Sequence, residues 1–327
     1  MKSVRKGCFV FLVVVLFFGS FLFNTPAAIA GYPERPITLI CPWSAGGGTD
    51  RISRMVAVLL EKDMGKPVTV VNRTGGGGAV GHTAGATAKP DGYTITMQTV
   101  EILMMHWMGL AKVSYKDYRN VCEISSDPAG IIVKADAPWN SVKELQEYIK
   151  ANPGKLKASG TAKGGIWDLA RAGWLKKAGL SLDAVPWVPS AGAAPALQEL
   201  VAGGVNIVTC QVTEAGPLID AEKLKALATM SGERNPLYPE VPTLKELGID
   251  WTAETFKVIG VPKKTPDSVA NILEKSFEKM VKSKEYLDFM KKNGFGVVWR
   301  SSADVEKYLA EADKFMGQLM KEAGLAK

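Results

Sequence analysis

Residues 36–60, PITLICPWSAGGGTDRISRMVAVLL, place an apolar run, a glycine-rich loop and an amphipathic segment in direct succession. The run at 36–41 predicts a buried strand, and residues 42–48 predict a turn. Apolar residues between 52 and 60 recur at helical spacing, and Gly-Lys-Pro at 65–67 ends that helix. A strand that leads through a short loop into a helix begins a β-α-β unit, so this stretch predicts an α/β fold.

The segments that follow continue the same alternation. Apolar runs at 68–71 and 93–97 predict two more strands, which gives β-α-β-α-β and a largely parallel sheet covered by helices. Residues 156–175, LKASGTAKGGIWDLARAGWL, repeat the order of strand, loop and helix. The remaining predicted elements are strands at 130–133, 205–210 and 224–230 and helices at 266–280, 284–292 and 302–324.

Two helix starts carry capping signals. Ser141 followed by Glu144 has the spacing of a capping box. Thr265 before Pro266 predicts an N-cap with proline at the first helical position.

Residues 1–30 predict a cleaved secretory signal. Three basic residues precede an almost unbroken apolar run at 8–23, and Ala-Ile-Ala at 28–30 forms a small-residue cleavage site. An uncleaved membrane anchor is the alternative, although the run is shorter than the roughly 20 residues that a span needs. Cleavage after Ala30 would remove three basic residues and lower the net charge from +7 to +4.

The exported chain carries no signal for nucleic acid, a metal or another cofactor. Its basic residues form no clustered tract, so nucleic acid is not an expected partner. Cys41, Cys122 and Cys210 lie far apart without a C-x-x-C pair; we expect buried thiols, and one disulfide stays open as an alternative. Only two histidines are present, and no Cys, His or carboxylate cluster has metal spacing.

The two glycine-rich loops suit an anion. A helix N-terminus leaves about four backbone N–H groups unpaired and carries about half a positive charge, and glycine lets an anion approach these groups closely. If the loops at 43–50 and 159–165 belong to different lobes, their helix ends face each other across a cleft. Such a cleft fits an acid with oxygens at both ends, and the candidate hydroxyl ligands are Ser44, Thr49, Ser159 and Thr161.

Each candidate also has a plainer interpretation. Thr49 or Asp50 fits a simple N-cap, and Lys163 fits a solvated loop lysine as well as a partner for an anion. An indole beside the loops either stacks on a ligand, with its N–H free, or packs in the core or at the interface between the lobes. The indoles in question belong to Trp43, Trp167 and Trp187.

Catalysis has little support in the sequence. There is no G-x-S-x-G elbow and no nucleophile with a His and Asp signature, so no catalytic residue is predicted. Glu101, Glu123 and Asp168 are isolated acids, for which a surface or capping role is expected.

Residues 70–83, VVNRTGGGGAVGHT, match two nucleotide signatures. Gly76, Gly78 and Gly81 spell G-x-G-x-x-G, and the same stretch resembles a P-loop with His82 in place of its lysine. Three polar residues separate the strand from the glycines, whereas a dinucleotide loop follows its strand tightly. We therefore predict a turn that needs positive φ within 75–78, and no nucleotide.

Several further motifs follow one another along the mature chain in a fixed order. They are YPERPITLICPWSAGGGTD at 32–50, VTVVNRTGGGGAVG at 68–81, KPDGYT at 89–94, AAPAL at 193–197, GGV at 203–205 and YPEVPT at 238–243. Together they resemble the substrate-binding proteins of tripartite tricarboxylate transporters, the Bug family, over nearly all of the mature chain.

The resemblance implies an α/β fold of two lobes, a clamshell in which each lobe is a mixed, mostly parallel sheet flanked by helices. Lobe 1 would comprise residues 31–129 and 254–327, and lobe 2 residues 130–253, because the chain of such a protein crosses twice. It also implies a monomer in the periplasm that binds an organic carboxylate and passes it to membrane permease subunits.

Family ligands are held by backbone N–H groups and hydroxyls of the two loops. Carried onto this sequence, the ligand-binding prediction comprises Trp43, Ser44, Ala45, Gly46, Gly47, Thr49 and Asp50 in the first lobe, and Ser159, Gly160, Thr161, Ala162, Lys163, Pro189, Ser190, Ala191, Gln211 and Thr213 in the second.

Two departures from the family pattern bear on the ligand. Asp168 stands where many relatives carry His, and the loop at 163–167 is bulkier and more basic than expected. An extra cation and an indole favour a longer or aromatic acid over a small dicarboxylate. A ligand-sensing protein that presents its closed form to a receptor, and an exported α/β enzyme, are the alternative functions.

Overall fold

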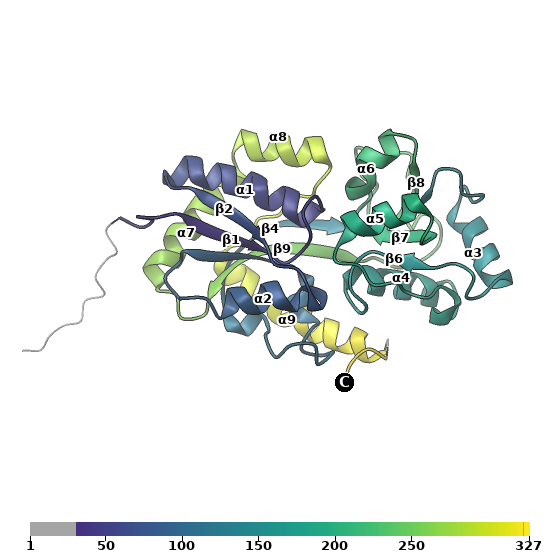
Figure 1. Ribbon diagram of the computed structural model, residues 1–327, viewed down its shortest axis with the longest axis horizontal. Coiled ribbons are helices and arrows are strands. Elements are labelled where there is room, and N and C mark those ends of the chain that lie inside the picture. Colours follow the sequence, from purple (N-terminus) through teal and green to yellow (C-terminus); the bar gives the residue numbers. More distant parts are fainter. Residues whose placement is uncertain (1–30, 323) are drawn as a thin grey trace, which may run out of the picture. The chain divides into compact units, whose positions relative to one another are not determined.

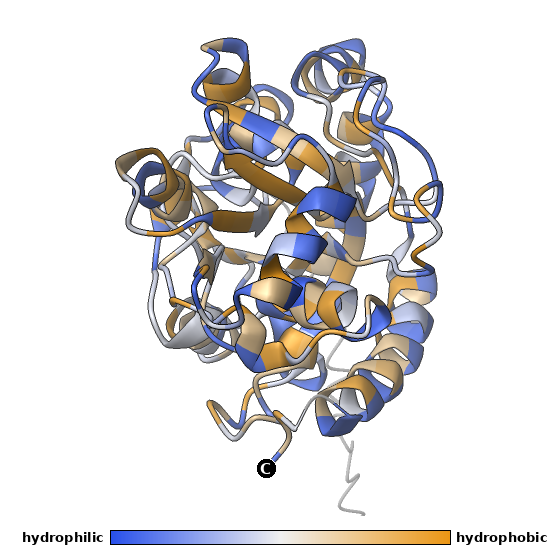
Figure 2. Ribbon diagram, turned by 90° about the vertical axis from the view of Figure 1, so that its right-hand side faces the viewer, coloured by the Kyte–Doolittle hydropathy of each residue, from blue (hydrophilic) through white to orange (hydrophobic). Residues whose placement is uncertain are grey.

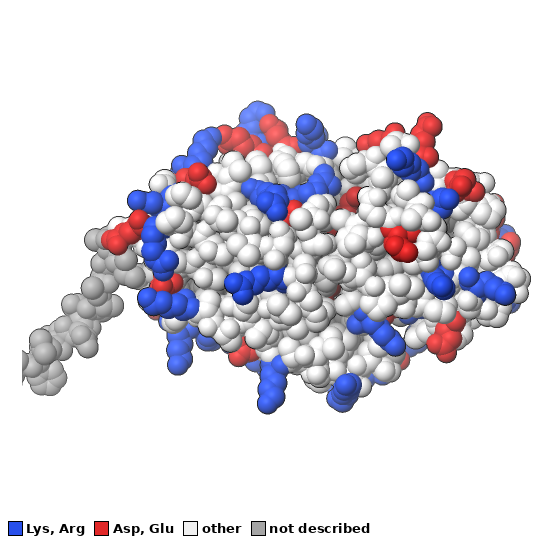
Figure 3. Space-filling view, viewed as in Figure 1, with Lys and Arg blue, Asp and Glu red and all other residues white. Residues whose placement is uncertain are grey.

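Two separate β-sheets organise the described chain, residues 31–322 and 324–327, in the computed structural model (Figure 1). Residues Gly31–Lys327 form one compact unit. The predicted signal at 1–30 lies outside the described residues. On the face drawn in Figure 3, side chains of Lys and Arg lie among those of Asp and Glu.

The first sheet has five strands in the order β2-β1-β3-β9-β4. β1 pairs in parallel with β2 and β3, whereas β9 runs antiparallel to β3 and β4, so only β9 opposes the common direction. β9, which comes late in the chain, thus lies between two strands from the first half. The strands are β1 (Ile37–Cys41), β2 (Val68–Asn72), β3 (Thr94–Gln98), β4 (Tyr118–Pro128) and β9 (Glu254–Pro262).

Helices cover both faces of this sheet. In Figure 1, α1 and α8 lie above it and α2 and α9 below it. Apolar side chains of α1, α7 and α8 pack with those of β1 and β3 into one core. The helices are α1 (Gly48–Met64), α2 (Ala79–Ala86), α7 (Asp267–Val281), α8 (Lys284–Asn293) and α9 (Ser302–Glu322).

The second sheet has four strands in the order β6-β7-β5-β8. Here β5 runs antiparallel to both of its neighbours, and β6 pairs in parallel with β7. Figure 2 shows the molecule from the end at which this sheet lies. Its strands consist mainly of hydrophobic residues, and hydrophobic and hydrophilic residues alternate along the surrounding helices. The elements are β5 (Gly130–Lys134), β6 (Ala158–Ser159), β7 (Ile207–Cys210), β8 (Leu224–Thr229), α3 (Val142–Ala151), α4 (Ile166–Lys177), α5 (Ala193–Ala202) and α6 (Val212–Asp220).

The chain passes from one sheet to the other twice, and the two crossing segments are joined by backbone hydrogen bonds. It crosses once between Pro128 and Gly130 and returns before Glu254. At the crossing, the Ala129 N–H donates to the Ala253 carbonyl at 2.8 Å, the Ala253 N–H to Met230 at 3.0 Å, and the Met230 N–H to Ala129 at 2.7 Å. These bonds tie the crossing segments together, while the lobe limits 31–129, 254–327 and 130–253 stay a prediction.

Most of the helices and strands predicted from the sequence are present, but several of them begin or end at other residues than predicted. The strand predicted at 156–159 has only two residues, and β4 and β9 were not predicted at all. α1 takes Gly47 as its N-cap rather than Thr49 or Asp50. α7 takes Pro266 rather than Thr265, since proline's backbone there is extended and not helical.

The predicted capping box at the start of α3 forms only half. The Ser141 hydroxyl accepts from the Glu144 N–H at 3.2 Å, as a cap should. The Glu144 carboxylate accepts from the Asn140 N–H at 2.7 Å instead of from Ser141. The glutamate therefore caps one residue further out than the spacing predicts.

The glycine run at 75–78 forms a turn, as predicted. All four of its glycines have positive φ, between +57° and +120°. Behind them, a Cβ added to Gly81 would lie 2.7 Å from both the Pro42 Cα and the Arg73 carbonyl oxygen. The glycines thus let α2 pack directly against the loop that follows β1.

Replacing Gly81 by alanine is expected to lower the free energy of unfolding by about 2 kcal/mol, because backbone atoms of two segments must move to admit the methyl group. Urea denaturation would measure it. Gly232→Ala is the matched control, since a Cβ there meets nothing within 4 Å. Equal stability of the two variants would refute the close packing.

Candidate functional site: a cleft between the two sheets

The N-terminal ends of α1 and α4 meet at a narrow cleft between the two sheets. The cavity measures about 20 Å³, which is room for about one water molecule. The two sides of the cleft are in direct contact, because the Gly48 N–H donates to Glu214 and the Ile166 N–H donates to Glu101 across it. The lining residues are Trp43, Ser44, Gly47, Gly48, Thr49, Thr99, Glu101, Thr161, Ile166, Trp167, Gly192, Ala193, Gln211, Glu214 and Thr255.

An aspartate braces the loop before α1. Asp50 lies in the first turn of the helix, and its Oδ2 accepts from the Gly46 N–H at 2.9 Å. Its oxygens also accept from Arg54 at 2.9 Å and from the Asn72 amide at 2.8 Å. Burial alone would raise the pKa of Asp50, but hydrogen bonds from Arg54, Gly46 and Asn72 hold it below its usual value. The carboxylate thus braces the loop before α1 through these three hydrogen bonds.

The loop before α4 repeats this arrangement. Asp168, also in the first turn, accepts from the Gly164 N–H at 2.9 Å, four residues earlier. Arg171 pairs with Asp168 at 2.7 Å, and both side chains are buried. Each lobe therefore fixes its glycine loop with an aspartate and an arginine.

Three buried oxygens in the cleft lack a hydrogen-bond partner among the described residues: Ser44 Oγ, Thr161 Oγ1 and Gln211 Oε1. Thr161 and Gln211 are 4% and 3% exposed. A buried polar atom without a partner costs about 1–3 kcal/mol. These atoms therefore mark where water or a polar ligand would be stabilised.

Two glutamates close the cleft from opposite sides. Glu214 of α6 accepts from the Gly48 N–H at the start of α1, at 2.6 Å. Glu101, which follows β3, accepts from the Ile166 N–H at the start of α4, at 3.2 Å. Burial raises the pKa of both carboxyls above the usual glutamate value.

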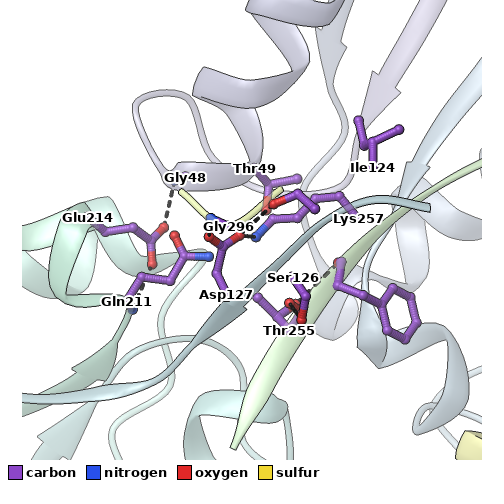
Figure 4. A network of polar contacts seen from close by, with 12 residues as sticks. Gly48, Thr49, Ile124, Ser126, Asp127, Gln211, Glu214, Thr255, Lys257 and Gly296 are labelled. Carbon is purple, nitrogen blue, oxygen red and sulfur yellow. Dashed lines mark hydrogen bonds and ion pairs between the residues drawn. The ribbon is translucent and has the colours of Figure 1, made fainter. Parts of the chain in front are cut away.

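A buried ion pair lies beneath the cleft, on the strands that cross between the sheets. The Lys257 ammonium on β9 pairs with Asp127 on β4, with side chains that are 0% and 3% exposed. Asp127 also accepts from the Gly296 N–H at 2.8 Å. Figure 4 shows this pair beside Glu214 and Gln211.

Sequence comparison then assigns the family. Residues 52–325 match the family model described as "Tripartite tricarboxylate transporter family receptor", TctC. The chain belongs to this TctC family. Its members are receptors rather than enzymes, in agreement with the absence of a predicted catalytic set.

Solved TctC-like structures share the two-lobed fold. A TctC solute-binding protein from Polaromonas is 33% identical, with 89% of this chain and 99% of that chain covered and a TM-score of 0.65. The periplasmic binding protein BugD is 28% identical, with 90% and 100% covered and a TM-score of 0.85. An R. palustris protein with adipate is 26% identical, with 90% and 99% covered and a TM-score of 0.85. The predicted α/β clamshell is thereby confirmed.

The predicted site residues of this TctC receptor divide into two groups. Trp43, Ser44, Gly47, Thr49, Thr161 and Gln211 line the cleft. The others lie outside its lining: Ala45, Gly46, Asp50, Ser159, Gly160, Ala162, Lys163, Pro189, Ser190, Ala191 and Thr213. Their role in binding a ligand stays a prediction.

Several outlying residues have other partners. The Ser159 hydroxyl donates to the Val188 carbonyl at 2.7 Å, and Lys163 is exposed. The structure therefore gives no support to the extra cation that favoured a longer or aromatic acid. The Trp43 indole does line the cleft, but its N–H donates to Thr99 Oγ1 at 3.0 Å and is not free.

Sequence reasoning missed the two glutamates as cleft residues. Glu101 is 2% exposed, so its predicted surface role is wrong. Its predicted capping role is confirmed, but the helix end that it caps is that of α4, on the other side of the cleft. Glu123 and Asp168 are also buried rather than exposed. The signal that could have been used is the repeated Gly-x-x-x-Asp at 46–50 and 164–168, which marks both loops.

The remaining sequence predictions concern thiols, metals and membranes. Cys41, Cys122 and Cys210 are buried and free. Among residues 31–322 and 324–327, the structure groups no three potential metal ligands. No helix within that part of the chain has the length and apolar character for crossing a membrane.

Proposed function

We propose that the protein captures an organic carboxylate in this cleft, in the periplasm, and delivers it to the membrane permease of a tripartite tricarboxylate transporter. The observation that carries the proposal is the pair of hydroxyls, Ser44 Oγ and Thr161 Oγ1, that have no partner among the described residues and lie between two facing helix N-termini. Hydroxyl and N–H donors at a helix start suit a carboxylate. The relative with adipate supports this class of ligand.

Capture requires the lobes to open. A six-carbon diacid is several times larger than the water-sized cavity, so the ligand enters when the two sheets separate. We place the hinge at the hydrogen-bonded crossing of Ala129, Met230 and Ala253, with lobe limits at 31–129, 254–327 and 130–253. Ligand contacts to both lobes would stabilise closure.

A thermal-shift screen of the mature protein tests this function. The panel holds mono-, di- and tricarboxylates, aliphatic and aromatic, with adipate included and NAD and ATP as controls. An acid present at about 100 times its dissociation constant is expected to add ~2.7 kcal/mol to the free energy of unfolding.

Two variants locate the bound acid. Thr161→Val removes the unpartnered hydroxyl from the cleft at nearly constant volume, and Thr87→Val removes a hydroxyl from the exposed end of α2. Acid binding should weaken in the first variant and not in the second. The proposal would be contradicted if no acid raised the melting temperature of the protein, or if NAD or ATP raised it.

A further inference from the structure

The chain's own carboxylates occupy both helix N-termini of the cleft, and each comes from the opposite lobe. Glu214, from the second sheet's side, accepts from the Gly48 N–H of α1. Glu101, from the first sheet's side, accepts from the Ile166 N–H of α4. Figure 4 shows the first of these contacts, with Glu214 directed at the start of α1.

Neither helix has a local side-chain cap that would make these contacts redundant. The N-cap residues are Gly47 for α1 and Gly165 for α4, and glycine has no side chain to accept from the first turn. The first N–H group of each helix therefore has its side-chain hydrogen-bond acceptor on the other side of the cleft, and this acceptor is within reach only when the cleft is closed.

An unpartnered oxygen lies beside each of these helix ends. A Cβ on Gly48 would lie 2.6 Å from Gln211 Oε1, and one on Gly165 would lie 2.9 Å from Thr161 Oγ1. Both oxygens are buried and have no hydrogen-bond partner within residues 31–322 and 324–327. Each glutamate therefore satisfies one N–H group at its helix end, and the Thr161 hydroxyl beside α4 remains able to donate to a ligand carboxylate.

The glutamates are held in place from their own side. The second oxygen of Glu101 accepts from the Thr99 hydroxyl at 2.5 Å, and Thr99 in turn accepts from the Trp43 indole. The second oxygen of Glu214 accepts from the Gln211 N–H at 3.3 Å. Each carboxylate is thus oriented towards the other lobe before the lobes meet.

We propose that Glu101 and Glu214 form an interlobe latch: they hold the ligand-free cleft closed by occupying the two helix ends that the carboxylates of the incoming acid take over. This inference rests on the proposed function, and it makes the two glutamates determinants of affinity rather than ligand contacts. A diacid replaces one internal carboxylate at each helix end and also accepts from the Thr161 hydroxyl.

Two consequences follow from the charges around the cleft. The carboxylates of Glu101 and Glu214 already occupy the helix ends and lie in the field of the buried Lys257, so adding the two charges of a dianion is unfavourable while the glutamates stay in place. The acid therefore binds only the fraction of molecules in which the latch is open. Apparent affinity is reduced by that fraction, and weakening the latch must increase it.

The experiment compares Glu101→Gln, Glu214→Gln and the double variant with wild type, using protein purified from the periplasm of an expression host. Glutamine keeps the shape and a neutral acceptor but loses the charge, and charge-assisted hydrogen bonds are about twice as strong as neutral ones. Glu147→Gln, the same change at an exposed position of α3, is the matched control. Small-angle scattering measures closure without ligand, and calorimetry measures adipate affinity.

The double variant is expected to have a larger ligand-free radius of gyration than wild type and to bind adipate about tenfold more tightly. Glu147→Gln should change neither. An unchanged radius and affinity in the double variant would overturn the latch while wild-type binding leaves the proposed function intact. Weaker binding in the variants would also overturn it, since the glutamates would then contact the ligand. Failure of the proposed function looks different: no protein in the set would bind any acid, although the variants would still open.

Discussion

Replacing Lys257 by methionine is expected to reduce the free energy of unfolding by about 3–5 kcal/mol, the largest effect of any single change considered for this protein. Lys257 and Asp127 are buried together between β9 and β4. Methionine fills the space of the lysine stem but leaves the Asp127 charge without its cation in a low-dielectric site. Urea denaturation at neutral pH would measure the loss.

Two further variants give this result its meaning. Lys257→Met combined with Asp127→Asn removes both charges and keeps an acceptor for the Gly296 N–H, so most of the stability should return. Lys279→Met breaks an exposed pair with Asp63, in which the lysine is 77% exposed, and should cost less than about 1 kcal/mol. If Lys257→Met cost no more than Lys279→Met, the crossing strands would not rely on the buried pair.

Acid is expected to remove about 3 kcal/mol of stability through His82 alone. Its ring is fully buried, and burial lowers its pKa to about 4. The Thr99 N–H donates to Nε2 at 3.2 Å, so Nδ1 must carry the proton that it shares with the Gly78 carbonyl at 2.8 Å. A protonated ring would lose the bond from Thr99.

The sign follows from the two pKa values. The unfolded chain protonates His82 near pH 6.5, whereas the folded chain resists until about pH 4. The contribution is therefore fully present above pH 6.5 and is lost as the pH falls towards 4. Burial raises the pKa values of Glu101 and Glu214, which act in the opposite direction because they favour the folded state at low pH.

The difference between wild type and His82→Gln isolates the histidine, since the glutamates are present in both. Unfolding free energies measured from pH 7.5 to 4.5 should converge as the pH falls, because only wild type loses the histidine contribution. Curves that stay parallel over this range would show that His82 is not held neutral by burial.

The order of elements was predictable because strand, loop and helix each leave a local pattern. The run at 36–41 became β1 and the helical spacing at 52–60 became α1. β4 and β9 were not predicted because charged residues interrupt their apolar runs. Glu123 on β4 and Lys257 on β9 are both fully buried. Their charges are matched by Arg300 and Asp127, which no local pattern could pair with them.

The candidate site was predictable only in its loops. Glycine and hydroxyl residues before a helix are visible in sequence, and Ser44 and Thr161 do line the cleft. The glutamates were not recognisable, since Glu214 meets a residue 166 positions earlier and Glu101 one 65 positions later. Such contacts depend on how the two sheets meet, which the loops alone do not specify.

The place of β9 also fixes the order in which the two sheets can be completed as the chain emerges. The second sheet draws all its strands from residues 130–229, so it can form as soon as that stretch has emerged. The first sheet must wait for residues 254–262, since β4 has no other strand partner and β3 keeps one edge unpaired until β9 inserts. Unpaired edges invite pairing with other chains. The first sheet, whose strands begin earliest in the chain, is thus the last to be completed. A chain interrupted before residue 254 leaves β4 and one edge of β3 without strand partners among the described residues.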